Sequence, residues 1–146
     1  MTINNMGREY RFYVYIMSNY KKRVLYVGVS NDLIRRTLEH QLGIGSYFTS
    51  KYHLKCLVYF EMYGDVYAAI NREKEIKGWK RFKKINLILA ENPQFKDLSS
   101  QFFKDCGFSD KDLGECKEDL LKRFKYRSAA LVEGSDPSRG AQDDKI

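Results

Sequence analysis

The sequence has no long hydrophobic run, and we expect no secretory leader. No stretch approaches the roughly 18 apolar residues that a transmembrane helix needs, so we expect no membrane-spanning segment. The first ten residues, MTINNMGREY, lack the apolar core of a signal peptide. We therefore expect a cytoplasmic protein that has no membrane partner and begins with a flexible N-terminus over residues 1–10.

Cysteine and proline are scarce. The three cysteines, Cys56, Cys106 and Cys116, are odd in number and include no CxxC pair, which argues against a disulfide framework and a structural zinc site. We expect these thiols to play no chemical role. Of the two prolines, Pro93 follows a helical segment and ends it.

Positive charge is concentrated in the first two-thirds of the chain. Of the 146 residues, 43% are apolar, which is enough for one globular domain with a hydrophobic core. The net charge is +7. Residues 1–98 hold 17 Lys and Arg against 9 Asp and Glu, whereas residues 99–146 hold 9 against 10. This bias favours a polyanionic partner, with nucleic acid ahead of a membrane surface.

Three segments have the composition of β-strands. Residues 11–17 and 24–29 are rich in aromatic and branched side chains, and the short polar turn between them favours an antiparallel hairpin. A turn centred on the middle of this polar segment sets Tyr15 opposite Tyr26, so that two phenols share one face of the sheet. Residues 54–62 form a mostly apolar third strand, which we expect to lie at the centre.

Helical periodicity begins directly after the second strand. Residues 32–42 carry an apolar stripe at a spacing of four and are followed by Gly43, which suits a helix C-cap. Arg36 and His40 lie four residues apart and therefore share another face of this helix. Residues 46–53 predict a polar and aromatic loop.

The next helix carries a carboxylate on its apolar side. Residues 65–77 have helical periodicity, and at about 100° per residue Glu73 falls near the centre of the apolar stripe, whereas Glu75 falls opposite. A carboxylate on the buried side must be paired, neutralised or bound to a metal. A further helix is expected over residues 79–90.

A basic segment spans the end of that helix and the start of the following one. Residues 72–84 contain seven Lys and Arg residues, and the run is either a solvated face or a phosphate-binding surface. Near a site that handles phosphate, the binding surface becomes the better interpretation. The residues to which we assign nucleic-acid contact are Lys77, Lys80, Arg81, Lys83 and Lys84.

The composition changes at residue 99. Phenylalanines and leucines in residues 99–127 predict a helical C-terminal extension, whereas residues 128–146 have no apolar period and predict a disordered tail. Together, these segments predict an α/β (α+β) fold. In this fold, residues 11–98 form a small three-stranded antiparallel sheet flanked by helices.

The order of the polar residues resembles that of the GIY-YIG nuclease superfamily. The sequence reads YVY at residues 13–15 and YVG at residues 26–28, followed by an arginine, a histidine four residues later and a glutamate on a later helix. The stretches GSYFTSKYHLKCLVYFE, AAINREKEIKGWKRFKKINLI and NPQFKDL are similar to the small stand-alone bacterial branch, which is related to the nuclease domain of an excinuclease. The resemblance covers residues 11–98 and implies a GIY-YIG-like nuclease domain there.

The resemblance also implies roles for individual residues. It assigns the helix arginine to Arg36 rather than Arg35, because only Arg36 has a histidine four residues further on. It implies that Gly28 is the structural glycine of the second motif, and that Tyr13 replaces the glycine of the first. The implied catalytic residues are Tyr15, Tyr26, Arg36, His40 and Glu73, of which Glu73 binds the metal.

These residue types suit phosphodiester hydrolysis. A single Mg²⁺ or Mn²⁺ held by Glu73 and waters would polarise the phosphate, and Arg36 could bind its non-bridging oxygens in a fork. A phenol has an ordinary pKa of about 10, so it acts as a base only where nearby cations stabilise the phenolate. We favour Tyr26 as the base with Tyr15 in support, and the reverse assignment stays open.

The sequence therefore predicts a metal-dependent endonuclease, and the resemblance implies DNA as substrate and a role in DNA repair or recombination. We expect Mg²⁺ or Mn²⁺ and no other small-molecule cofactor. One alternative is a non-catalytic nucleic-acid-binding module on the same fold. A weaker alternative is an adaptor that uses residues 99–127 to bind another protein.

Overall fold

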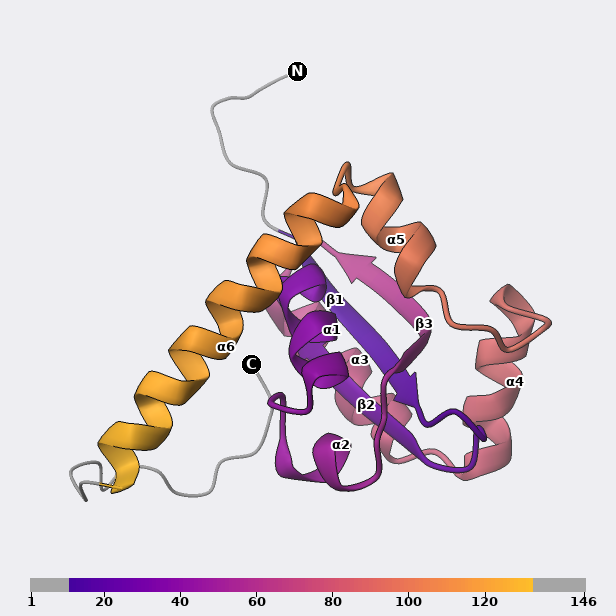
Figure 1. Ribbon diagram of the computed structural model, residues 1–146. Helices are drawn as coiled ribbons and strands as arrows, with labels where there is room; N and C mark the ends of the chain where they lie inside the picture. The colour runs from indigo at the N-terminus through magenta and orange to yellow at the C-terminus, as the bar shows by residue number, and fades with distance from the viewer. Residues whose placement is uncertain (1–10, 133–146) are drawn as a thin grey trace.

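The computed structural model describes residues 11–132, which form a three-stranded sheet with helices on both faces (Figure 1). The bounds of its elements, in chain order, are β1 Phe12–Ser18, β2 Leu25–Ser30, α1 Leu33–Leu42, α2 Tyr47–Lys51, β3 Cys56–Tyr63, α3 Val66–Lys77, α4 Arg81–Glu91, α5 Ser99–Asp105 and α6 Asp110–Val132. This arrangement confirms the predicted α/β (α+β) fold. Within the described part of the chain, no helix combines the length and the apolar character that crossing a bilayer requires.

The strands are antiparallel and lie in the order β2-β1-β3, so β1 is the central strand. The prediction that residues 54–62 form the centre is therefore wrong. β1 is buried along almost its whole length because it is paired on both edges and covered on both faces. The apolar run of β3 reflects burial of its first half only, since Met62 near its end is 56% exposed.

The hairpin turn between β1 and β2 is centred one residue later than predicted. Tyr15 pairs with Gly28, and Tyr26 pairs with Met17, so the two tyrosines are not directly opposite each other. The Asn19 side chain sets this turn, because its Oδ1 accepts hydrogen bonds from two backbone N–H groups at the start of the returning chain. The partner of each residue shifts by two positions, which leaves every side chain on its predicted face.

Local signals at the ends of α1 agree with the sequence. The carboxylate of Asp32 caps the first turn by accepting a hydrogen bond from the backbone N–H of Arg35 at 3.1 Å. Gly43 ends the helix in the left-handed conformation, with φ of 78°, which glycine adopts at little cost. The caps therefore confirm both ends of the predicted helix to within a residue.

The segment after α1 differs from its prediction as a loop, because residues 47–51 form the short helix α2. The hydroxyl of Ser46 accepts a hydrogen bond from the backbone N–H of Thr49 at 3.1 Å, which is an N-cap contact. A single helical turn is too short to show an apolar period. The only sign of this helix in the sequence is Ser46, a residue type that caps helix N-termini. This turn returns the chain against the α1 face of the sheet.

Two hydrophobic clusters lie on the opposite faces of the sheet. On one face, Tyr15 and Tyr26 pack with Leu33 and Leu38 of α1. On the other, the cluster includes residues of β1 and β2 together with Ala69, Ile76 and Ile88 from α3 and α4. Figure 1 shows α1 and α6 in front of the sheet and α3 behind it.

The C-terminal extension is helical, as predicted, and it is part of the core. Phe102 and Phe103 of α5 and Leu120 of α6 are buried in the cluster on the α1 face. Helix α6 continues to Val132, so the predicted tail begins at least five residues too early. Residues 133–146 and 1–10, predicted to be disordered or flexible, lie outside the described residues.

Candidate active site

The phenol of Tyr15 lies over the backbone of Gly28 on the α1 face of the sheet. The two residues are paired across β1 and β2, and Tyr15 is fully buried. A Cβ atom added at Gly28 would lie 2.5 Å from the Tyr15 hydroxyl oxygen, closer than any side chain permits. The glycine at this position therefore makes room for the phenol.

His40 connects α1 to both the sheet and α2. Its Nε2 lies 2.9 Å from the Tyr15 hydroxyl oxygen, and its Nδ1 lies 2.9 Å from Thr49 Oγ1. The imidazole is fully buried, and a Cβ added at Gly45 would lie 2.5 Å from Nδ1. Two hydrogen bonds and two close backbone approaches thus fix the orientation of the phenol and the imidazole.

The imidazole of His40 is held in its neutral form. Burial, together with the nearby positive charge of Arg36, lowers its pKa from the ordinary value of 6.5 to about 3. A neutral imidazole donates a hydrogen bond through one nitrogen and accepts through the other. Either neutral tautomer can form both hydrogen bonds, because the hydroxyls of Thr49 and Tyr15 can each donate or accept.

Arg36 lies beside the hydrogen bonds that join Thr49, His40 and Tyr15, and its guanidinium points inward. Its Nη1 donates to Glu39 Oε1 at 2.9 Å and to the Gly45 carbonyl at 3.2 Å. Burial alone would lower the pKa of Arg36, but interactions with the Tyr15 phenol and the Glu39 carboxylate raise it above its ordinary value. Arg35 is the more exposed of the two arginines, with 39% of its side chain accessible against 15% for Arg36. This difference supports the choice of Arg36.

Tyr26 is the phenol of the group that lies nearest the surface. Its ring centroid is 6.3 Å from that of Tyr15, 5.5 Å from that of His40 and 6.0 Å from that of Phe48. Tyr26 is 9% exposed, whereas Tyr15 and His40 are fully buried. Of the two tyrosines, Tyr26 is therefore the better placed to meet a substrate.

Glu73 approaches the sheet from the opposite layer. It lies on the buried stripe of α3, between Ala69 and Ile76, and is fully buried, which confirms the position derived from helical periodicity. Its Oε2 lies 2.7 Å from the Lys77 ammonium, one turn further along the helix. The structure thus brings Tyr15, Tyr26, Arg36 and His40 together on the α1 face, whereas Glu73 lies in the layer of α3 on the other face.

The donor set at Glu73 fits a hydrated Mg²⁺ rather than a cage built of protein ligands alone. Within residues 11–132, no three His, Cys, Asp or Glu side chains are grouped to hold a metal ion. Mg²⁺ usually keeps several waters and binds through one or two carboxylates together with substrate phosphates. Glu73 supplies one such carboxylate, but its side chain is fully buried and paired with Lys77, so a hydrated ion can bind only when the ammonium leaves and the carboxylate becomes accessible to solvent.

The predicted basic surface is largely exposed and extends onto the β1–β2 hairpin. Arg81 Nη2 donates to the Lys22 carbonyl oxygen at 2.9 Å, which joins the start of α4 to the hairpin turn. The ammonium of Lys83 lies over the Trp79 ring, 4.4 Å from its centroid. Burial and the neighbouring cations Arg81 and Lys77 lower the pKa of Lys84. This crowding of positive charge suits a polyanionic partner.

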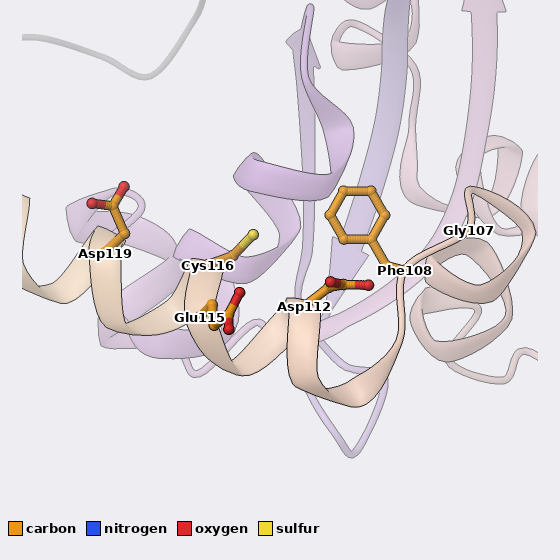
Figure 2. Close-up of a pocket in the computed structure, with 6 residues that line it drawn as sticks. All are labelled: Gly107, Phe108, Asp112, Glu115, Cys116 and Asp119. Atoms are coloured by element: carbon orange, nitrogen blue, oxygen red, sulfur yellow. The ribbon is translucent and has the colours of Figure 1, made fainter.

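A separate pocket on α6 has the opposite character (Figure 2). It is lined by Gly107, Phe108, Asp112, Glu115, Cys116 and Asp119. Its three carboxylates would repel phosphate, and its apolar side is formed by Phe108 and Cys116, which pack against the hydrophobic cluster that contains Tyr15.

Comparison with known sequences identifies the domain. The GIY-YIG catalytic domain family matches residues 11–86, just over half of the chain. The chain belongs to the GIY-YIG family. The match covers all of the predicted catalytic residues and confirms the family expected from the two tyrosine motifs.

Among similar sequences are UPF0213 proteins of bacteria and archaea, whose names state no activity. One from Staphylococcus saprophyticus is 37% identical over 78 residues, which cover 53% of this chain and 94% of that protein. One from Haloquadratum walsbyi is 40% identical over 75 residues, covering 51% of this chain and 83% of that protein. One from Staphylococcus aureus is 41% identical over 64 residues, covering 44% of this chain and 78% of that protein. No solved structure matches the chain significantly.

Sequence reasoning missed two residues of this GIY-YIG site. Thr49 supplies the hydrogen bond to His40 Nδ1, and Gly45 leaves the space that the imidazole occupies. The only local signal for Thr49 is the helix-capping Ser46 three residues earlier, within the segment predicted as a loop. Gly45 carried no separate signal, because it stands close to the helix-ending glycine.

Tyr13, which replaces the glycine of the first GIY-YIG motif, packs against the C-terminal extension. Its ring lies edge-on to Phe102 of α5 at a centroid distance of 6.0 Å and edge-on to Phe60 of β3 at 6.3 Å. It is 9% exposed. The substitution therefore adds aromatic contact to α5, and Tyr15 keeps its position over Gly28.

Proposed function

We propose that this chain is a metal-dependent endonuclease that hydrolyses phosphodiester bonds in DNA. The observation that carries the proposal is the hydrogen-bonded chain from Thr49 through His40 to Tyr15, next to Arg36 and the partly exposed Tyr26. A fixed phenol, a neutral imidazole and a guanidinium at one spot are suited to activating water and stabilising a charged phosphorane-like state. Membership of the GIY-YIG catalytic domain family supports the same reaction.

Each residue of the α1 face has a role in this reaction. Tyr26, the more exposed phenol, orients the attacking water and accepts its proton. Arg36 donates to the non-bridging oxygens as their charge grows, and its positive charge stabilises the phenolate form of a neighbouring tyrosine. Tyr15 and His40 act as positioning residues, because they hold Tyr26 and Arg36 from a fully buried layer.

Glu73 would hold the metal. A Mg²⁺ or Mn²⁺ bound there would supply Lewis-acid polarisation of the phosphate. The chain's own contribution is a carboxylate buried in the α3 layer and paired with Lys77 until a divalent cation replaces the ammonium.

DNA is the proposed substrate, and repair or recombination the proposed setting. The exposed cations Lys80, Arg81 and Lys83, together with Lys84, would contact the phosphate backbone without reading sequence. Such contacts predict binding that weakens steeply as the salt concentration rises.

The test is nicking and cleavage of linear, branched and single-stranded DNA by the purified protein in Mg²⁺ or Mn²⁺. We expect cleavage by the wild type and its loss in Tyr26→Phe and Glu73→Ala. Tyr67→Phe is a matched control, because Tyr67 is 73% exposed on α3. Absence of cleavage on every substrate, or wild-type rates in both site variants, would contradict the proposal. Salt-sensitive binding without cleavage would instead assign the chain to the non-catalytic nucleic-acid-binding class.

A further inference from the structure

Helix α2 presents aromatic rings to solvent directly beside the candidate active site. Tyr47 is 79% exposed, and Phe48 and Tyr52 are each 40% exposed. These three residues form what we call the α2 aromatic surface. It lies on the same side of the sheet as His40, because Thr49 on the opposite side of the helical turn hydrogen-bonds to that imidazole.

Two rings of this surface, those of Phe48 and Tyr52, continue a series of ring contacts that begins at Tyr26. The Phe48 centroid lies 6.0 Å from that of Tyr26 with an interplanar angle of 31°, and 4.9 Å from that of Tyr52. A path of ring contacts therefore runs from the phenol nearest the reaction to the open surface. Anything stacked on Phe48 or Tyr52 would be held next to Tyr26.

A cation accompanies the rings. The ammonium of Lys51 lies 5.4 Å from the Tyr52 centroid and 5.8 Å from the Tyr47 centroid. Exposed rings interleaved with a lysine are typical of surfaces that bind single-stranded nucleic acid, where bases stack on the rings and cations contact the backbone. An apolar protein partner would gain nothing from a lysine at the centre of the patch.

We propose that the α2 aromatic surface is a stacking subsite for an unpaired nucleobase next to the phosphodiester that is cleaved. The proposal rests on the proposed function only for the position of the cleaved bond. A paired base exposes only its edges in the grooves, so it must leave the duplex before its face can stack on Phe48 or Tyr52. An unpaired base pays no such cost, and the substrate class favoured is therefore nucleic acid with a single-stranded segment at the site of cleavage.

A second copy of this chain is the competing occupant. A stable protein interface buries on the order of 1,000 Å² or more, which is more than three side chains of one helical turn supply. The charge of the surface also favours a polyanion, because Lys51 and the nearby Lys55 both carry positive charge and are exposed. A nucleic-acid strand is thus the better match.

The experiment measures binding of oligonucleotides that carry the fluorescent base 2-aminopurine, in the absence of divalent metal so that no cleavage occurs. One oligonucleotide is single-stranded, a second is the same strand in a full duplex, and a third carries the base in a single-stranded flap. We expect the full-length wild type to quench the fluorescent base in the single strand and the flap, and to bind both about tenfold more tightly than the duplex. Stacking of one base on an aromatic side chain accounts for a difference of this size.

Variants separate stacking from charge. Phe48→Leu with Tyr52→Leu should abolish quenching and lower single-strand affinity about tenfold, with little change for the duplex. Tyr52→Leu alone should lose part of the quenching, which guards against a fold defect from the loss of Phe48. Tyr67→Leu is the matched control, since Tyr67 is also solvent-exposed but lies on α3, and it should bind like the wild type.

Several outcomes would overturn the subsite. These are equal affinity for single strand and duplex, quenching that survives in the double variant, or an equal loss in Tyr67→Leu. Dimerisation that depends on Phe48 and Tyr52 would assign the surface to a second copy of the chain. Failure of the nuclease proposal looks different, because the protein would then quench the unpaired base and yet cleave nothing in Mg²⁺ or Mn²⁺.

Discussion

The two faces of the sheet hold buried polar groups in different ways. On the α1 face, Tyr15, His40 and Thr49 are joined by hydrogen bonds of 2.9 Å between groups that are fully buried. On the α3 face, the buried carboxylate of Glu73 meets the ammonium of Lys77, a residue whose side chain is 38% exposed. One face has short, rigid side chains, and the other has a long side chain that reaches in from solvent.

This difference shows which part of the site is preorganised and which part can change. The α1 face is fixed by backbone that passes within contact distance of both rings, at Gly28 and Gly45. A lysine has several rotatable bonds and can leave its partner, so the cation at Glu73 can be exchanged. Preorganised donors suit transition-state stabilisation, whereas an exchangeable cation suits metal binding.

The largest expected effect comes from filling the space beneath Tyr15. In Gly28→Ala the new Cβ would lie 2.5 Å from the Tyr15 hydroxyl oxygen, and a buried ring cannot move without losing its bond to His40. We expect a loss of about 3 kcal/mol in the free energy of unfolding and about a hundredfold loss of cleavage rate. Chemical denaturation and single-turnover cleavage measure the two effects.

Gly64→Ala is the matched control for this substitution. A Cβ at Gly64 meets nothing within 4 Å, so stability and cleavage should stay close to those of the wild type. Equal effects of the two substitutions would show that the α1 face tolerates displacement of Tyr15 and is not rigid.

The next effect is the acid sensitivity of the α1 face. His40 has a pKa of about 3 in the folded protein and an ordinary value of 6.5. Between these two pH values, the imidazole is protonated in the unfolded chain but neutral in the folded protein. The contribution of neutral His40 to the free energy of unfolding is fully present above pH 6.5 and is lost as the pH falls from 6.5 towards 3. At pH 5 the wild type should have lost about 2 kcal/mol more than His40→Gln, relative to pH 7.

Denaturation of both proteins across this range measures the difference, and NMR titration of the imidazole provides an independent readout. Parallel stability curves, or an imidazole that titrates near 6.5, would contradict a buried neutral His40. Because His40 does not titrate between pH 5 and 8, it should also add no inflection to the cleavage profile there.

Short-range patterns in the sequence predicted more of the site than long-range ones. The spacing of Arg36 and His40 fixes a shared helix face, and the position of Glu73 in an apolar stripe predicts its burial. Both depend only on the geometry of a single helix. The prediction that Tyr15 and Tyr26 share one face of the sheet is also confirmed, because a shift of two residues in register leaves each side chain on the same face.

The features that failed depend on contacts distant in sequence. β1 is central because β3 pairs with the edge of β1 that β2 leaves open. The apolar content of a strand does not predict this pairing. The role of Thr49 depends on α2 folding back onto His40 across nine residues of chain. The packing of Phe102 on Tyr13 likewise joins distant parts of the described chain, so the extension could be predicted as helical but not as part of the core.

On the α3 face, replacing the cation tests whether it is exchangeable. Lys77→Met removes the ammonium that lies 2.7 Å from Glu73, and should lower the free energy of unfolding by about 1.5 kcal/mol. It should also raise the affinity for Mn²⁺, measured by calorimetry without DNA, because no ammonium competes for the carboxylate. Lys74→Met, an exposed position on the same helix, is the control. Unchanged Mn²⁺ affinity in Lys77→Met would argue that Glu73 is not the metal ligand.

The smallest effect, and the sharpest comparison within one face, comes from two buried threonines. Thr49→Val keeps the shape of the side chain but removes the hydroxyl that meets His40 Nδ1, so we expect a loss of about 1 kcal/mol in stability. Thr37, also fully buried, has a hydroxyl with no hydrogen-bond partner among the described residues, so Thr37→Val should be neutral or stabilising. Thr49→Val should also lower kcat with little change in KM, because the freed imidazole no longer holds Tyr15 against Arg36. If both valines had the same effect, the hydroxyl of Thr49 would serve only packing, and the hydrogen-bond chain would end at His40.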